Sequence, residues 1–144
     1  RLAHLLAAEG IAIIPAPTQD EGMGSSLAAC IAASADAAGW VVALADMPFI
    51  RPQTISSVLA ALQSGAPLTA PAFQGQRGHP VGFDGRFRKD LLALHGDEGA
   101  RHLLRAHQGE IEMIECTDAG VIRDIDHPAD LRENRIPGAA SDQP

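Results

Sequence analysis

Five segments of the chain carry apolar residues at the spacing of an amphipathic helix. They are residues 2–9, residues 25–35, residues 52–62, residues 87–94 and residues 100–107. Gly10 is a typical stop for the first helix, and Pro52 suits the first position of the third. Either Ser25 or Ser26 can cap the second helix, because a serine hydroxyl accepts a hydrogen bond from the free N–H groups of a first turn.

Short apolar runs typical of β-strands lie between these helices. They span residues 11–15, 40–45, 68–73, 80–83, 111–116 and 121–125. The run from Trp40 to Ala45 lacks polar alternation, as expected of a strand buried on both faces of a parallel sheet. Two later runs flank the loop from Gly75 to Gly78 at hairpin spacing. Because strands alternate with helical segments, the sequence predicts an α/β fold whose sheet is mostly parallel and covered on both sides.

The 144 residues are enough for one domain, which we place at residues 1–136. Pro137 opens a tail of small and polar residues, 137–144, for which we expect disorder. The chain begins with Arg1, and the pattern that follows is already that of a helix. We therefore expect the sequence to lack the beginning of the protein.

Composition excludes several classes of protein. With 46% apolar and 20% charged residues, the chain is typical of a soluble globular protein. Its 11 basic and 18 acidic residues give a net charge of −7, which argues against a nucleic-acid-binding protein. No apolar run approaches the roughly 18 residues of a membrane-spanning helix. Cys30 and Cys116 form no metal-binding or redox motif, so we expect two free thiols and a cytoplasmic protein.

Asp46 lies at the carboxyl end of the most apolar predicted strand, where open α/β sheets bind ligands. Asp124 and Asp126 close the run 121–125, and strand alternation would point both to the same side. Mg²⁺ is usually held by one or two carboxylates together with substrate phosphates and water, so Asp46 and Asp126 are candidate magnesium ligands. The alternatives remain open. Asp46 can form a turn or cap the next helix, and Asp126 and Asp130 can cap a last helical turn.

Three polar loops add candidate binding groups. Residues 22–26, Gly-Met-Gly-Ser-Ser, offer backbone N–H groups and two hydroxyls at a helix start, where anions bind. Arg77 can clamp a phosphate, and His79 is held extended by the proline that follows. A third loop, residues 96–101, ends in Arg101, and each loop could equally be an exposed turn or a helix cap. The chain has neither a G-x-S-x-G nor an H-E-x-x-H motif, which argues against a serine hydrolase or a zinc peptidase.

Taken in order, these blocks resemble the MobA-like nucleotidyltransferase family and, within it, the molybdenum-cofactor cytidylyltransferase branch. The resemblance covers roughly residues 5–131. The blocks that carry it are Gly22-Met23-Gly24-Ser25-Ser26-Leu27, Ala45-Asp46-Met47-Pro48, Arg77-Gly78-His79-Pro80-Val81, Gly96-Asp97-Glu98-Gly99-Ala100-Arg101 and Asp124-Ile125-Asp126-His127-Pro128-Ala129-Asp130-Leu131.

The resemblance implies a Rossmann-like, three-layer fold of the nucleotide-diphospho-sugar transferase type. Such enzymes transfer a nucleotidyl group from a nucleoside triphosphate to a phosphate acceptor and release pyrophosphate. In this branch the usual donor is CTP, with GTP in relatives, and the acceptor is molybdopterin. The implied cofactor is Mg²⁺, and a molybdoenzyme or a chaperone is an implied partner protein.

The resemblance also gives roles to individual residues. It implies that Asp46, in the family's G-D-x-P block, and Asp126, in its D-x-D-x-P block, bind Mg²⁺. It places the nucleoside against Gly22, Gly24, Ser25 and Ser26, and the acceptor against Arg77, His79, Asp97 and Arg101. Nucleotidyl transfer needs in-line positioning and charge neutralisation rather than a protein nucleophile, which suits this set of residues.

Two departures set this chain apart from the family pattern. The family's first strand leads into the glycine-rich loop L-A-A-G-x-S-x-R-M-G, which cradles the triphosphate, and this sequence contains no such motif. Ala45 also stands where the family usually has glycine. We therefore expect the family's N-terminal strands to be missing, which would expose a sheet edge and favour a dimer through that edge. A non-catalytic module that binds molybdopterin or a partner protein is the alternative to an enzyme.

Overall fold

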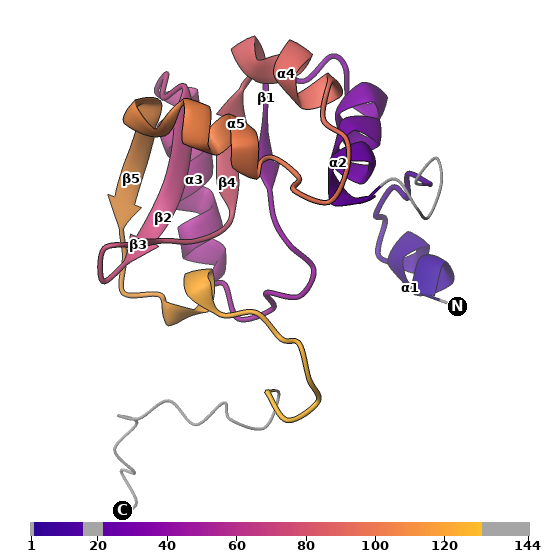
Figure 1. Ribbon diagram of the computed structural model, residues 1–144. Coiled ribbons are helices and arrows are strands. Elements are labelled where there is room, and N and C mark those ends of the chain that lie inside the picture. Colours follow the sequence, from indigo (N-terminus) through magenta and orange to yellow (C-terminus); the bar gives the residue numbers. More distant parts are fainter. Residues whose placement is uncertain (1, 16–21, 131–144) are drawn as a thin grey trace, which may run out of the picture.

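The computed structural model describes residues 2–15 and 22–130, and Figure 1 shows their arrangement. Its helices are α1 (Leu2–Ala8), α2 (Gly22–Ala33), α3 (Pro52–Gln63), α4 (Arg88–Leu92) and α5 (Arg101–Ala106). Short 3₁₀ helices are η1 (Gly85–Phe87), η2 (Gln108–Glu110) and η3 (Ala119–Ile122). The strands are β1 (Gly39–Val42), β2 (Leu68–Phe73), β3 (Gln76–Arg77), β4 (Val81–Asp84) and β5 (Ile111–Glu115). The expected disordered tail, residues 137–144, lies outside the described residues.

The strands form one sheet in which β4 lies between β1 and β2. β4 is antiparallel to both of these neighbours, β3 is antiparallel to β2, and β5 is parallel to β2. β1, β2 and β5 therefore run in one direction. The α/β fold is confirmed, but in the described sheet most neighbouring strands are antiparallel rather than parallel. The connection from Phe73 to Val81 is too short for a helical crossover, so the chain returns beside β2 in the opposite direction.

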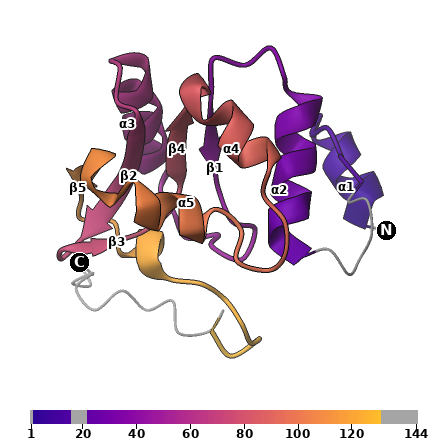
Figure 2. The same cartoon turned by 45° about the horizontal axis from the view of Figure 1, so that its top comes forward.

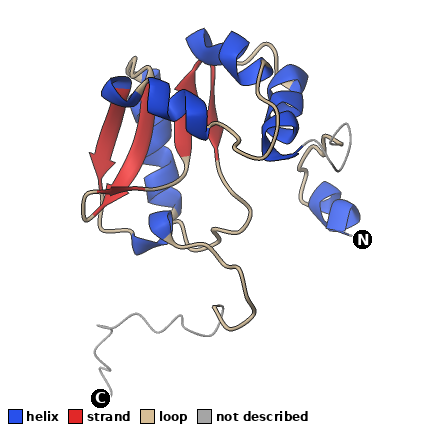
Figure 3. Cartoon of the chain, viewed as in Figure 1, coloured by secondary structure: helices blue, strands red, loops and turns tan. Residues whose placement is uncertain are grey.

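Helices cover both faces of the sheet, which confirms the expected three-layer arrangement (Figures 2 and 3). α3 packs on one face, and Gly82 allows its close approach. A Cβ at Gly82 would lie 2.6 Å from Thr69 Cγ2 and 2.9 Å from the Leu62 side chain. α2, α4 and α5 cover the opposite face, where their apolar residues meet those of β2 and β4.

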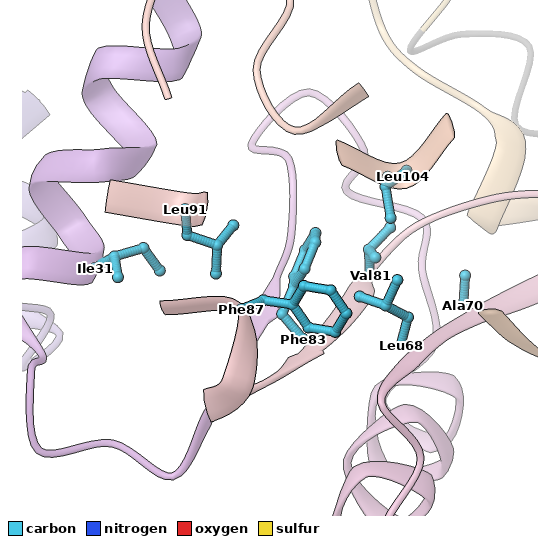
Figure 4. Close-up of a cluster of buried hydrophobic side chains, with 8 residues drawn as sticks. All are labelled: Ile31, Leu68, Ala70, Val81, Phe83, Phe87, Leu91 and Leu104. Carbon is cyan, nitrogen blue, oxygen red and sulfur yellow. The ribbon is translucent and has the colours of Figure 1, made fainter. Parts of the chain in front are cut away.

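The main hydrophobic core lies beneath α2, α4 and α5 (Figure 4). Its buried members are Ile31, Leu68, Ala70, Val81, Phe83, Phe87, Leu91 and Leu104. Phe83 is only 1% exposed, and full burial of a side chain of this size contributes about 1.5–3 kcal/mol. The core fixes β4 firmly in the middle of the sheet, and so it also fixes the segment of residues 77–80 that leads into β4.

Two predicted strands are wrong. Residues 11–15 do not pair with any strand among the described residues, and Ile11, Ile13 and Ile14 are 38–51% exposed. A β-branched run favours extended backbone, but a strand also needs a neighbour that supplies hydrogen bonds. Residues 121–125 are not a strand either, because the chain turns through η3 and then continues without regular structure to Asp126.

The remaining predictions differ from the structure mainly at element boundaries. β2 has the predicted limits, and α3 begins at Pro52 as predicted. α2 begins at Gly22 rather than at Ser25 or Ser26, so residues 22–26 are the first turn of a helix and not a loop. In the described part of the chain no helix is long and apolar enough to cross a membrane.

Candidate functional site

A cavity of about 430 Å³ opens on the sheet face that α2 and α5 cover. Its walls come from the sheet, from the start of α2, and from the loop and helix of residues 97–104. The lining residues are Met23, Leu27, Val42, Leu44, Arg77, His79, Val81, Phe83, Asp97, Glu98, Ala100, Arg101 and Leu104. We call this cavity the cleft. Pockets that bind small molecules typically measure roughly 300–1,000 Å³ and combine an apolar floor with a few polar groups, and the cleft has both properties.

Four residues predicted for the acceptor side lie in the cleft. Arg77, His79, Asp97 and Arg101 all line it, although Arg77 and Arg101 lie 24 positions apart in the sequence. Among the described residues neither guanidinium takes part in an ion pair or a side-chain hydrogen bond, and both are exposed. Guanidinium groups that are free in this way can bind a phosphate or carboxylate through two hydrogen bonds each.

His79 presents a neutral imidazole to the cleft. Its backbone N–H donates to the Val121 carbonyl at 2.8 Å, and its peptide bond to Pro80 is cis. Burial of the ring and the neighbouring Arg77 guanidinium lower the pKa of His79 below 6.5, although Asp46 opposes this shift. The Nδ1 atom is buried and has no hydrogen-bond partner among the described residues. Because His79 lines the cleft, its neutral imidazole can accept or donate one hydrogen bond to a bound ligand without adding charge.

Asp46 follows the end of β1 by four residues and lies near enough to His79 to affect its pKa. Its carbonyl accepts a hydrogen bond from the Ile125 N–H at 2.8 Å, and this bond brings the backbone next to Asp126 beside Asp46. Both aspartates are exposed, and neither carboxylate has a hydrogen bond or an ion pair among the described residues. Asp130 differs, because its carboxylate accepts from the N–H groups of Asp126 at 3.0 Å and His127 at 2.7 Å. The predicted capping of this last turn is therefore the work of Asp130, and these hydrogen bonds lower the pKa of Asp130.

The carboxylates of Asp46 and Asp126 are chemically suited to a divalent cation. Hard cations such as Mg²⁺ prefer oxygen ligands and complete their coordination with water and substrate phosphates. Within residues 2–15 and 22–130, no group of three or more histidine, cysteine or acidic side chains could hold a metal ion by itself. A cation bound here would therefore also need ligands from the substrate.

The first turn of α2 lies against the loop that joins α4 to α5 (Figures 1 and 2). The Gly24 N–H donates to the Gly96 carbonyl at 2.8 Å, and a Cβ at Gly24 would lie 2.6 Å from the His95 carbonyl oxygen. The Ser26 hydroxyl donates back to the Gly22 carbonyl at 3.3 Å. Gly24 therefore holds the loop that carries Asp97, and in residues 22–26 it is Met23 that lines the cleft.

The gathering of these separate blocks around one cavity agrees with the comparison to known families. The model of the MobA-like NTP transferase domain matches residues 1–111. The chain belongs to this family. The match includes Asp46, the segment from Arg77 to His79, and Arg101, but it ends before Asp126. The match therefore covers every sequence block of the resemblance except the last one, residues 124–131.

Two relatives of this chain have names that refer to different processes, one to nicotine blue and the other to purine catabolism. Nicotine blue oxidoreductase of Paenarthrobacter nicotinovorans is 31% identical over 113 residues, which are 73% of this chain and 55% of that protein. The purine catabolism protein PucB of Bacillus subtilis (strain 168) is 31% identical over 112 residues, or 76% of this chain and 54% of that protein. The chain thus spans about half the length of each relative.

Similar solved structures support the same fold. The crystal structure of Rv0371c from Mycobacterium tuberculosis H37Rv superimposes with a TM-score of 0.65 at 25% identity, covering 76% of this chain and 57% of that one. The Rv0371c homologue from Mycobacterium sp. strain JC1 gives a TM-score of 0.60 at 27% identity, covering 73% and 54%. A further structure shows Rv0371c in complex with manganese, with a TM-score of 0.60 at 24% identity over 72% and 57% of the two chains.

Asp118 is a structurally important residue of this MobA-like chain that the sequence patterns did not predict. Asp118 is 3% exposed and accepts hydrogen bonds from the Arg51 N–H at 2.8 Å, the Thr54 hydroxyl at 2.6 Å and the Gly120 N–H at 3.0 Å. It joins the start of α3 to η3, and η3 contains Val121, the residue that anchors His79. The available signal was Asp118-Ala119-Gly120, since an aspartate often accepts a hydrogen bond from the N–H two residues later in a turn.

Proposed function

We propose that the protein is a metal-dependent nucleotidyltransferase that transfers CMP from CTP to molybdopterin and releases pyrophosphate. One observation carries the proposal. Arg77, His79 and the loop of residues 97–101 come from separate parts of the sequence and line one cleft of ligand-binding size, and Asp46 lies near enough to His79 to oppose the lowering of its pKa. The chain's membership of the MobA-like NTP transferase family supports the class of reaction.

The nucleotidyl transfer requires no covalent bond between the protein and the substrates. An oxygen of the acceptor phosphate attacks the α-phosphorus of CTP, a new P–O bond forms, and the bond between the α-phosphorus and the bridging oxygen breaks to release pyrophosphate. The protein must hold the two phosphates in line and offset their negative charge. No nucleophilic side chain is required.

The residues of the cleft can divide this work between them. Arg77 and Arg101 carry free guanidiniums that can bind and orient the acceptor phosphate. His79 is neutral, so it can give or take one hydrogen bond at an acceptor oxygen without adding charge. The carboxylates of Asp46 and Asp126 would hold a divalent cation, which neutralises triphosphate charge and acts as a Lewis acid when bound.

The choice of CTP and molybdopterin rests on the sequence blocks of residues 22–26 and 77–80. The names of the two relatives show that family members serve other chemistry, so the substrates need a direct test. GTP is the second candidate donor. A cytoplasmic location and delivery of the product to a molybdoenzyme or its chaperone are part of the same proposal.

The decisive experiment is a transfer assay on the full-length protein. CTP or GTP is supplied with molybdopterin and with Mg²⁺ or Mn²⁺, and both pyrophosphate and nucleotidylated pterin are measured. Manganese is included because Rv0371c has been crystallised with it. We expect product with CTP and a divalent cation, and none after chelation with EDTA.

Two variants test the proposed metal ligands, and a third serves as the control. Asp46→Asn is expected to lower kcat at least about 100-fold, because loss of a metal ligand removes several kcal/mol of transition-state stabilisation. Asp126→Asn should also lower kcat. Asp90→Asn removes an exposed carboxylate on α4 and should leave the rate unchanged. Full activity of the Asp46 variant would contradict the metal role, and tight molybdopterin binding without any product would favour the non-catalytic module.

A further inference from the structure

A second cavity of about 480 Å³ adjoins the cleft between β3, α5 and β5. Its lining includes Arg77, Leu104, Arg105, Gln108, Ile111 and Met113. Arg77 and Leu104 line the cleft as well, so these two side chains form the boundary between the two cavities. A ligand that reaches past Arg77 from the cleft would enter this second cavity.

The second cavity differs from the rest of the protein in its charge. The chain carries a net charge of −7, yet the residues that line this cavity include two arginines and no carboxylate. Among the described residues Arg105, like Arg77, has no ion pair and no side-chain hydrogen bond. Glu110, which follows Gln108 by two residues, is paired with His107 at 2.7 Å instead. Positive charge at this place is therefore not neutralised by the protein itself.

The floor of the second cavity is apolar. Leu104 and Ile111 contribute to it, and Met113, which also lines the cavity, is 41% exposed. A thioether is a flexible and polarisable surface that contacts flat rings favourably. The cavity thus combines an apolar floor with two guanidiniums and the amide of Gln108.

We propose that this second cavity is an anion subsite that extends the cleft and binds a carboxylate or phosphate carried on an apolar or aromatic body. Arg77 and Arg105 bind the anion, Gln108 donates a further hydrogen bond, and Met113 contacts the body of the ligand. This inference rests on the proposed function in one respect, because it makes the bound group a remote part of the acceptor. The acceptor then carries an anionic group besides the phosphate that receives the nucleotide.

The methionines provide separate reporters for the two cavities. The chain has 3 methionines: Met23 lines the cleft, Met113 lines the second cavity, and Met47 is 7% exposed outside both. The full-length protein is labelled with ¹³C-methyl methionine, and the signals are assigned with Met23→Leu and Met113→Leu variants. Phenyl phosphate and, separately, benzoate are then titrated in, which distinguishes a phosphate ligand from a carboxylate ligand.

We expect phenyl phosphate, benzoate or both to shift the Met113 methyl signal saturably. Arg105→Ala should weaken that binding about tenfold, which is the loss expected for one or two hydrogen bonds to a charged group. Arg86→Ala removes another exposed guanidinium, one that pairs with Asp84 outside this cavity, and should leave the binding unchanged. Gln108→Leu should weaken binding less than Arg105→Ala does.

The proposal is overturned if neither compound moves the Met113 signal, or if only the Met23 signal moves. It is also overturned if Arg105→Ala binds both compounds as tightly as the unaltered protein. Because the titration needs no turnover, its result is independent of the transfer assay. A Met113 shift without nucleotidyl transfer would leave the subsite standing and reject the proposed function, whereas transfer without a Met113 shift would do the reverse.

Discussion

The Thr54 hydroxyl donates a 2.6 Å hydrogen bond to the buried carboxylate of Asp118, 64 positions further along the chain. The bond ties the first turn of α3 to η3. Because the carbonyl of Val121 in η3 also accepts the His79 N–H, this contact supports the cleft without facing it. Thr54 and Asp118 do not line the cleft, yet they help to hold the backbone of His79, which is predicted to bind the acceptor substrate.

Removing either partner of this hydrogen bond should destabilise the fold. Asp118→Asn is expected to lower the free energy of unfolding by about 2–4 kcal/mol, because buried donors lose their charged acceptor. Thr54→Val should cost about 1–2 kcal/mol, since it removes one donor and keeps the shape. Urea unfolding of the full-length protein measures both. Ser56→Ala, which removes an exposed hydroxyl bonded within α3, should change stability by less than about 0.5 kcal/mol, and a larger effect there than at Thr54 would contradict this account.

The close contact of Gly78 with η3 predicts a second effect on stability. A Cβ at Gly78 would lie 2.6 Å from the Val121 carbonyl carbon and 2.7 Å from its Cβ, and backbone cannot yield as a flexible side chain can. Gly78→Ala should therefore destabilise by about 1–3 kcal/mol. Gly109→Ala is the matched control, because nothing lies within 4 Å of a Cβ there. Equal melting temperatures for the Gly78 variant and the control would refute the predicted clash.

The lowered pKa of His79 predicts a specific dependence of stability on pH. The unfolded chain binds a proton near pH 6.5, whereas the folded chain resists it because of burial and Arg77. The unfolded state therefore holds more protons in the window between the folded pKa and 6.5, so this contribution to stability is complete above pH 6.5 and is lost as the pH falls below it.

Unfolding measured in urea between pH 5 and pH 8 tests this dependence. His79→Gln should lose less stability than the unaltered protein as the pH falls, because the titrating group is gone. Arg77→Ala should also reduce the loss, since the guanidinium is one cause of the lowered pKa, and Asp46→Asn should increase it. Parallel pH profiles for the unaltered protein and His79→Gln would show that His79 titrates normally.

The contact between α2 and the loop of residues 95–97 predicts an effect on substrate affinity. Gly24→Ala would place a Cβ 2.6 Å from the His95 carbonyl oxygen and displace the loop that carries Asp97. We expect KM for the acceptor to rise roughly tenfold, because misplaced binding groups cost of the order of 1 kcal/mol or more. Steady-state kinetics of the transfer reaction measure it, with Gly109→Ala again as the control. An unchanged KM would mean that this loop does not position the acceptor.

Local patterns predicted the helices and the central strands well. Pro52 fixed the start of α3, and the apolar run of residues 68–73 became β2 without change. The run at residues 11–15 failed as a prediction, because the partner that makes a strand is not visible in the segment itself. The run at residues 121–125 failed because Gly120 packs closely against the backbone of Phe49, where an added Cβ would lie 2.5 Å from the Phe49 carbonyl carbon, and no local pattern reveals this tertiary contact.

The sequence predicted which residues belong to the candidate site better than it predicted how the structure positions them. Arg77, His79, Asp97 and Arg101 were all chosen from their loops, and all four line the cleft. The alternation argument for Asp126 lost its basis when residues 121–125 proved not to be a strand. Asp46 nevertheless lies beside the backbone next to Asp126, because the Ile125 N–H donates to the Asp46 carbonyl. Residue types alone could not predict this backbone hydrogen bond.

That bond, from the Ile125 N–H to the Asp46 carbonyl, involves main-chain atoms alone. Substitutions of the Asp46 and Asp126 side chains can therefore alter the charge of the carboxylate pair without removing this bond. Proline at position 125 would do the opposite, because it removes the donor and keeps both carboxylates. The charge of the proposed two-carboxylate site and the backbone contact that joins its two segments can therefore be varied one at a time.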